Sequence, residues 1–234
     1  MNEREILTSW DSNASLWTRA VRESWIASRR AGSDDAILQA ILRQPAGSAL
    51  DVGCGEGWLA RKLAAEGWDV AGVDASVELI RTAQQAGAGA YFALTYEEIA
   101  ADPSLLRGPH DAIVCNFALL GESLGPLLAA LRTALAPAGR LLIQTVHPRE
   151  VCGDEPYQDG WRLETFNGFG EGQWAPMPWY FRTEESWRRE LEAARFRIDE
   201  WEAPRHPESG RPLSLLITAL TTPQPSALFH SPTV

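Results

Sequence analysis

The chain has 234 residues, of which 45% are apolar and 22% charged, a composition typical of a globular protein with one sizeable core. Its 21 basic and 31 acidic residues leave a net charge of −10, which disfavours nucleic acid as a partner. No apolar stretch could span a bilayer and the start lacks a signal-peptide core, so we expect a cytoplasmic protein that does not bind membranes. Because only 3 cysteines occur, we expect no metal site.

Residues 1–46 are predicted to form a helical cap. Apolar residues between Leu16 and Trp25 recur at steps of three and four, which is the spacing of one helical face. A second helix is expected after Ser33 and Asp34, because both are favoured N-cap residues.

From residue 47 onward, short apolar runs alternate with helical segments, as in a parallel sheet covered on both faces. The expected strands are 48–52, 68–73, 90–93, 112–117 and 140–146, with helices at 56–66, 77–86, 96–101 and 124–135. A helix at 184–194 precedes strands at 196–201 and 213–220, whose helix-free connection makes the last strand antiparallel. The sequence predicts a single doubly wound, Rossmann-like α/β domain over 47–220 and a mobile tail at 221–234.

A glycine-rich turn follows the first strand and opens the next helix. Gly53 and Gly55 allow close approach of the backbone to a ligand, and the helix N-terminus offers free N–H groups. Asp74 ends the second strand, where a carboxylate can accept both ribose hydroxyls of a nucleoside. Together these features favour a nucleoside cofactor. The alternative is that the glycines only turn the chain and that Asp74 caps the following helix through Ser76.

Asp51, two residues before the first glycine, distinguishes a dinucleotide site from a site for a sulfonium-containing nucleoside. A carboxylate there repels the pyrophosphate of a dinucleotide but suits a ligand with an amino group and a sulfonium. The only lysine, Lys62, is not part of a Tyr-x-x-x-Lys pair, which also disfavours a nicotinamide oxidoreductase.

Residues 50–57, together with Val73-Asp74-Ala75-Ser76, resemble the first two motifs of the class I S-adenosylmethionine-dependent methyltransferases. The resemblance covers about residues 35–220. It implies a seven-stranded sheet with one reversed strand and a cofactor over the carboxyl ends of the first, second and fourth strands.

The resemblance assigns roles to individual residues of this chain, position by position. The resemblance implies that Gly53, Cys54 and Gly55 approach the methionine part of S-adenosylmethionine, that Asp51 lies near its amino group, and that Asp74 binds the ribose. The implied adenine contact is Ala75, and the residues implied beside the sulfonium are Asn116 and Phe117.

This sequence departs from the family after the third strand, where an Asp often meets the adenine. Thr95 and Tyr96 are the candidates here, with simple helix capping as the alternative for Thr95. By analogy with small-molecule members, the N-terminal segment with Trp10 and Trp17 would fold over the cofactor, and one arginine, Arg29 or Arg30, would pair with its carboxylate. A solvated arginine is the alternative.

His147 directly follows the fifth strand, at the edge where open-sheet sites lie. It is a candidate general base for an acceptor that must lose a proton. The alternative is a histidine that orders the turn before Pro148.

The insertion at 148–182 is too long for an ordinary connection and is rich in aromatic residues. The candidates for substrate binding are Tyr157, Trp161, Trp174, Trp179 and Tyr180. Such a lid suggests a flat aromatic or heteroaromatic small molecule, whereas the alternative is a small core for the loop itself. The function expected is O- or N-methylation of that molecule. The alternatives are an NAD-dependent oxidoreductase and a non-catalytic S-adenosylmethionine-binding protein.

Overall fold

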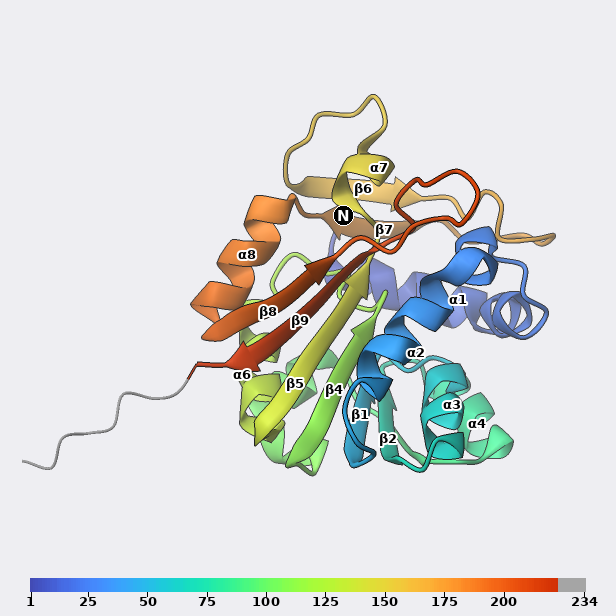
Figure 1. Ribbon diagram of the computed structural model, residues 1–234. Helices are drawn as coiled ribbons and strands as arrows, with labels where there is room; N and C mark the ends of the chain where they lie inside the picture. Colours follow the sequence, from blue (N-terminus) through green and yellow to red (C-terminus); the bar gives the residue numbers. More distant parts are fainter. Residues whose placement is uncertain (223–234) are drawn as a thin grey trace, which may run out of the picture.

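A seven-stranded sheet forms the centre of the computed structural model, which describes residues 1–222 (Figure 1). Its strand order is β3-β2-β1-β4-β5-β9-β8, and β9 runs antiparallel to both neighbours. The strands are β1 (Ser48–Val52), β2 (Asp69–Asp74), β3 (Ala90–Ala93), β4 (His110–Asn116), β5 (Leu135–Thr145), β8 (Phe196–Glu202) and β9 (Leu215–Thr221). The predictions of a seven-stranded Rossmann-like sheet and of an antiparallel last strand are confirmed.

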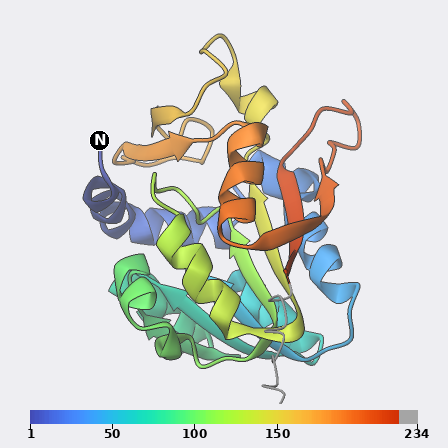
Figure 2. The same cartoon turned by 90° about the vertical axis from the view of Figure 1, so that its left-hand side faces the viewer.

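The described helices are α1 (Glu3–Arg22), α2 (Asp34–Leu42), α3 (Trp58–Ala65), α4 (Val77–Ala86), α5 (Tyr96–Ala101), α6 (Gly125–Ala134), α7 (Pro148–Cys152) and α8 (Glu184–Ala193), with short helical turns at Arg29–Ser33 and Pro103–Leu106. Six of them cover the two faces of the sheet. Helices α5, α6 and α8 pack on one face and α2, α3 and α4 on the other, and Figure 2 shows α6 and α8 together on their side.

The central strands are apolar on both faces because both faces are buried. Leu50 and Val52 of β1 contribute to the core beneath α5, α6 and α8, whereas Ala49 contributes to the core beneath α2 and α3. All three side chains are at most 1% exposed. This burial explains why β1 is a continuous apolar run and not an alternating one.

The N-terminal helix differs from its prediction. It begins at Glu3, where Asn2 and Glu5 form a capping box, and it ends at Arg22 instead of continuing to Trp25. Ser24 adopts a left-handed φ of 57°, and the Trp25 N–H returns to the Ala20 carbonyl at 2.9 Å, which closes the helix.

The insertion after β5 contains α7 and a hairpin of β6 (Gly160–Glu164) and β7 (Met177–Phe181). The hairpin lies beyond the carboxyl ends of β4 and β5, at the top of Figure 1. It is joined to α1 by Asn13, whose fully buried side chain accepts from the Ala175 N–H and donates to the Ala175 carbonyl, both at 2.8 Å. The N-terminal cap and the lid are therefore packed against each other.

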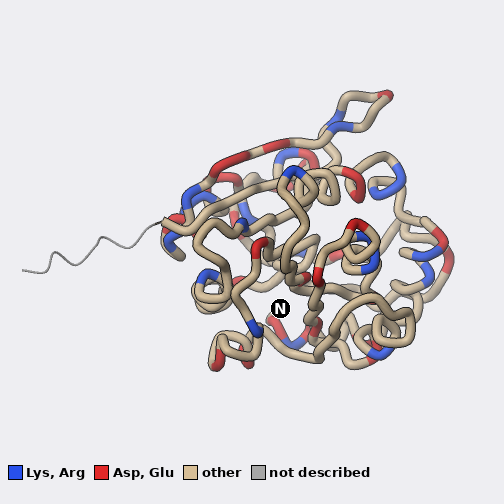
Figure 3. Tube along the Cα trace, turned by 60° about the horizontal axis from the view of Figure 1, so that its bottom comes forward, with Lys and Arg blue, Asp and Glu red and all other residues tan. Residues whose placement is uncertain are grey.

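Most of the predicted tail at 221–234 lies outside the described residues. Within residues 1–222, no helix combines the length and apolar character needed to cross a membrane. Figure 3 shows Lys and Arg interspersed with Asp and Glu along the trace.

Glu56 connects α1 to the glycine loop. Its fully buried carboxylate accepts from Arg22 Nε at 2.8 Å and from Arg61 Nη2 at 2.7 Å. We expect Glu56→Gln to lower the free energy of unfolding by about 1.5 to 3 kcal/mol, because charge-assisted hydrogen bonds are lost. Chemical denaturation of the purified variant measures this change. The control is Glu23→Gln, whose exposed pair with Arg19 should contribute less than about 1 kcal/mol; equal effects of the two variants would contradict the prediction.

Candidate functional site

The glycine loop is held in a conformation that requires glycine. Gly53 and Gly55 have φ of +74° and +56°, in the left-handed region. A Cβ on Gly53 would collide with Ala118, which follows β4. The N–H groups of Gly53 and Cys54 both donate to the Val73 carbonyl, at 2.8 and 3.0 Å. The loop is thus fixed against β2 on one side and against the segment after β4 on the other.

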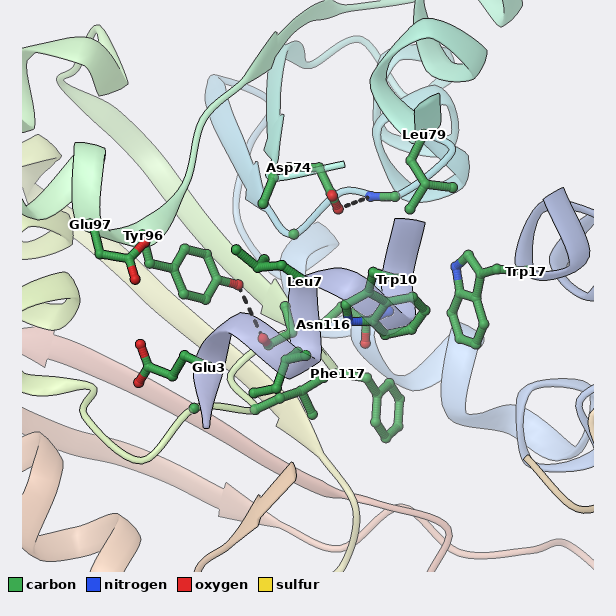
Figure 4. Close-up of a pocket in the computed structure, with 17 residues that line it drawn as sticks. Glu3, Leu7, Trp10, Trp17, Asp74, Leu79, Tyr96, Glu97, Asn116 and Phe117 are labelled. Carbon is green, nitrogen blue, oxygen red and sulfur yellow. Dashed lines mark hydrogen bonds between the residues drawn. The ribbon is translucent and has the colours of Figure 1, made fainter. Parts of the chain in front are cut away.

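A pocket of about 790 Å³, partly open to solvent, lies over this loop. Its wall includes, from the sheet side, Gly53, Gly55, Asp74, Ala75, Leu79, Tyr96, Glu97, Asn116, Phe117 and Ala118, and from α1, Glu3, Ile6, Leu7, Trp10 and Trp17. Figure 4 shows α1 crossing the pocket with Trp10 and Trp17 beside each other; their ring centroids are 5.0 Å apart. We call this the glycine-loop pocket.

Asp74 is fixed by two backbone donors. Its Oδ2 accepts from the Gly55 N–H at 2.9 Å, the contact drawn in Figure 4, and its Oδ1 accepts from the Ser76 N–H at 2.8 Å. Burial raises the pKa of Asp74, and these two donors partly offset that rise. Each carboxylate oxygen keeps a second lone pair that can accept a ligand hydroxyl. The contact between Asp74 and the Ser76 N–H, which the helix-cap alternative expects, is therefore present. Asp74 can still accept further hydrogen bonds from a ligand in the pocket.

Asp51 is buried near the end of β1, with 2% of its surface exposed. Burial, and then the nearby Asp74 carboxylate, raises the pKa of Asp51 to about 7. Neither a cation nor a hydrogen-bond donor of the described chain offsets this effect. Asp51 does not line the pocket itself, but it leaves an uncompensated carboxyl group behind the glycine loop.

The pocket wall is acidic. Three carboxylates, Glu3, Asp74 and Glu97, line it, and none of the described lining residues is Lys, Arg or His. Asn116 adds a buried Oδ1 that has no hydrogen-bond partner among the described residues. A wall of this kind repels phosphate groups and favours a ligand that carries positive charge. The residues present therefore fit a nucleoside with an amino group and a sulfonium.

The two candidates after the third strand, Thr95 and Tyr96, lie in different places. Tyr96 lines the glycine-loop pocket, and its hydroxyl donates to the Ala118 carbonyl at 3.1 Å. Thr95 instead caps α5, accepting from the Glu98 N–H at 3.2 Å within a capping box, and it does not line the pocket. The capping alternative therefore describes the position of Thr95, and a role for it in cofactor binding stays an untested prediction.

A second pocket of about 1030 Å³, also partly open, lies between the sheet edge and the lid; we call it the lid pocket. It shares four wall residues with the glycine-loop pocket: Trp10, Trp17, Phe117 and Leu120. Trp179 and Tyr180 of β7 line it, together with Phe166 and Phe169. The two pockets therefore meet at the end of β4.

The other three lid candidates lie outside both pockets. The Tyr157 hydroxyl accepts from the Glu184 N–H at 2.9 Å, at the start of α8. Trp161 donates to Glu122 Oε2 at 3.2 Å, and Trp174 belongs to the small cluster that packs the lid on α1. These rings stabilise the lid itself, as the alternative interpretation of the aromatic residues expects.

Arg29 and His147 are placed differently from the other candidates. Arg29 lines the lid pocket, not the glycine-loop pocket, and pairs with Asp34 at 2.8 Å. His147 is the N-cap residue of α7, lines neither pocket, and has a buried Nδ1 without a partner among the described residues. Val146 and Val151, on either side of it in sequence, do line the lid pocket.

Several wall residues were missed from the sequence, and two groups of them bear on the site. The first turns of α1 supply Glu3, Ile6 and Leu7, which the capping box at Asn2 could have indicated. Arg182 lines the lid pocket, but a lone arginine after an aromatic run carries no distinctive sequence signal.

Comparison with known proteins places this site in context. A family model described as "Methyltransferase domain" matches residues 26–200. A curated ubiquinone biosynthesis O-methyltransferase from Ralstonia nicotianae is 34% identical over 102 residues, and this match spans 42% of this chain and 42% of that protein. The chain thus aligns with less than half the length of that relative.

Two solved structures share the fold. The Burkholderia thailandensis 1,6-didemethyltoxoflavin-N1-methyltransferase, solved with 1,6-didemethyltoxoflavin and S-adenosylhomocysteine, has a TM-score of 0.64 and 24% identity, covering 94% of this chain and 88% of that one. The Synechocystis magnesium protoporphyrin IX methyltransferase with bound S-adenosylhomocysteine has a TM-score of 0.63 and 18% identity, covering 90% and 94%.

The raised pKa of Asp51 predicts a specific pH dependence of stability. An acid whose pKa is higher in the folded state binds more protons there, so its contribution to stability falls as pH rises from about 4 to about 7. Asp51→Asn, which stays neutral, should match the wild type near pH 4 and be more stable by up to about 4 kcal/mol near pH 8. Urea denaturation across this range measures the difference. The control is Asp69→Asn at the exposed start of β2; a difference between Asp51→Asn and wild type that does not vary with pH would contradict the prediction.

Proposed function

The chain belongs to the methyltransferase-domain family of S-adenosylmethionine-dependent enzymes, and we propose that it methylates an oxygen or nitrogen of a small, flat aromatic or heteroaromatic acceptor. The named relatives support both choices of atom, since one is an O-methyltransferase and another an N1-methyltransferase. The aromatic wall of the lid pocket supports the choice of acceptor.

The observation that carries this proposal is the wall shared by the two pockets. Trp10, Trp17 and Phe117 line both of them, so ligands in the two pockets would be in contact at the end of β4. A transfer reaction needs such a junction, because holding two reactants in line can supply roughly 7 to 11 kcal/mol of the barrier.

In this proposal S-adenosylmethionine supplies, when bound, a methyl group on a positively charged sulfur. Asp74 accepts the ribose hydroxyls, held in place by the Gly55 and Ser76 N–H groups. Asp51 provides the negative charge that the amino group of the methionine part requires. The Asn116 Oδ1, which lacks a partner, faces the same positive charge from the end of β4.

His147 is our candidate for removing the acceptor's proton. Its Nδ1 has no hydrogen-bond partner in the described chain, and its neighbours Val146 and Val151 line the lid pocket. A neutral imidazole in this position can accept a proton from a phenol, an enol or a heteroaryl N–H group. Trp10 and Trp17 line the junction of the two pockets with apolar rings.

The cofactor assignment predicts selective stabilisation. S-adenosylmethionine and S-adenosylhomocysteine should raise the melting temperature, whereas NAD should not, because the wall is acidic. Asp74→Asn should weaken S-adenosylhomocysteine binding by about 10- to 150-fold, since a charge-assisted acceptor of the ribose is lost. Calorimetry measures this, with Asp69→Asn as the control. Stabilisation by NAD alone, or normal affinity in Asp74→Asn, would contradict the assignment.

The activity itself is tested by transfer of a labelled methyl group from S-adenosylmethionine to a panel of aromatic hydroxyl and amine compounds. We expect turnover on at least one flat aromatic member. With that acceptor, His147→Ala should lower the rate by about 10²- to 10⁴-fold at neutral pH and recover as the acceptor ionises at higher pH. His206→Ala, in the β8–β9 connection, is the control. An equal loss at every pH would show that His147 only orders the turn.

A further inference from the structure

Arg182 is a buried guanidinium whose donors are only partly used. It follows β7 directly, is 3% exposed and lines the lid pocket. Its Nη2 donates to the carbonyls of Gly121 and Glu122, both at 2.6 Å. Its Nη1 is buried and has no hydrogen-bond partner among residues 1–222.

No carboxylate of the described chain pairs directly with Arg182; Glu190 has the largest electrostatic effect on it, followed by Asp159 and Glu122. Glu122 Oε2 accepts from Trp161, and Asp159 accepts from the Thr183 N–H at 2.8 Å and pairs with Arg189 at 3.3 Å. Within the described chain, Arg182 itself forms no ion pair. Burial lowers the pKa of Arg182, and the attraction of Glu190 and the other carboxylates offsets this lowering only in part. The aromatic rings of Tyr180 and Trp187, at 4.9 and 5.4 Å, supply only a weak substitute.

The rest of the lid pocket supplies no counter-charge for Arg182. It is mostly aromatic and aliphatic, and apart from Arg182 its charged wall residues are Arg29, which pairs with Asp34, and Glu164, whose Oε1 accepts from the Phe166 N–H at 2.6 Å. An unpaired buried charge is costly, and an anion that enters the pocket would remove that cost.

We propose that Arg182 binds an anionic oxygen of the methyl acceptor, either a carboxylate or an ionised hydroxyl, carried on a flat apolar body. This inference rests on the proposed function, because it defines the class of acceptor for that reaction. The aromatic wall contacts the flat body of the acceptor, and the N–H groups of Nη1 donate to its charged oxygen.

The position of Arg182 also orients such an acceptor. The loop that holds its Nη2 includes Gly121, which lines the glycine-loop pocket. The charged end of the acceptor therefore lies on the side of the lid pocket where the two pockets meet. If the only role of Arg182 were to tie the lid to this loop, a neutral ligand would bind as well as a charged one.

The test uses the full chain saturated with S-adenosylhomocysteine and three matched probes: 2-naphthoate, 2-naphthamide and 2-naphthol. Quenching of tryptophan fluorescence reports binding, because Trp10, Trp17 and Trp179 line the lid pocket. We expect the wild type to bind naphthoate at least about tenfold more tightly than naphthamide. Arg182→Gln should abolish this preference and Arg182→Lys should keep part of it.

Arg162→Gln is the matched control. Arg162 also lies in the lid and against an aromatic ring, but it does not line either pocket and it already pairs with Glu155 at 3.0 Å. This variant should keep the full preference for naphthoate. The absorbance of bound naphthol distinguishes the two kinds of oxygen: if the site ionises hydroxyls, naphthol binds as naphtholate at neutral pH and Arg182→Gln prevents this.

The proposal is overturned if the wild type binds naphthoate and naphthamide equally and binds naphthol only in its neutral form. It is also overturned if Arg182→Gln keeps the full preference for naphthoate over naphthamide. The melting shift with S-adenosylhomocysteine shows whether each variant is folded. If Arg182→Gln does not fold, the wild type and Arg182→Lys still decide the outcome. Failure of the proposed function is separate, because it would appear as no cofactor-induced shift or no methyl transfer, whatever the preference among the probes.

Discussion

A carboxyl group buried behind a glycine loop, without a cation to neutralise it, is the constraint on which this site depends. Asp51 is fixed in β1 between two neighbouring strands, so it cannot turn toward solvent. The loop beyond it presents Asp74 and an acidic wall to the pocket. Together they make a site in which a positively charged nucleoside relieves an electrostatic cost, whereas a pyrophosphate would add to it.

The N-terminal helix and the lid complete that site as one packed unit. α1 is held to the glycine loop by the Arg22–Glu56 ion pair and to the lid by Asn13 and Ala175. Trp17 lies on the helix between these two anchors and Trp10 lies three residues before Asn13, and both residues form a wall of both pockets. A change in the position of α1 would therefore affect cofactor and acceptor together.

The sequence predicted the central fold well because its signals are local. The bounds of β1, β3, α4 and α5 match their predictions, since each is set by an apolar run with a turn or a capping residue beside it. Glu3, Ile6 and Leu7 at the start of α1, and Arg182, were missed because their places in the pocket walls depend on contacts between distant segments, which periodicity does not report. Thr95 illustrates the same limit: one residue type serves equally as a helix cap and as a ligand contact, and only the structure distinguishes them.

The most direct test is the number of protons released when S-adenosylhomocysteine binds. Calorimetry near pH 6, in two buffers that differ in ionisation enthalpy, gives this number. Because the pKa of Asp51 is raised to about 7 in the free protein, a bound ammonium group should ionise it and release close to one proton, and Asp51→Asn should release none. Binding without proton release by the wild type, or equal release by the variant, would contradict the assignment of Asp51 as the counter-charge of the cofactor.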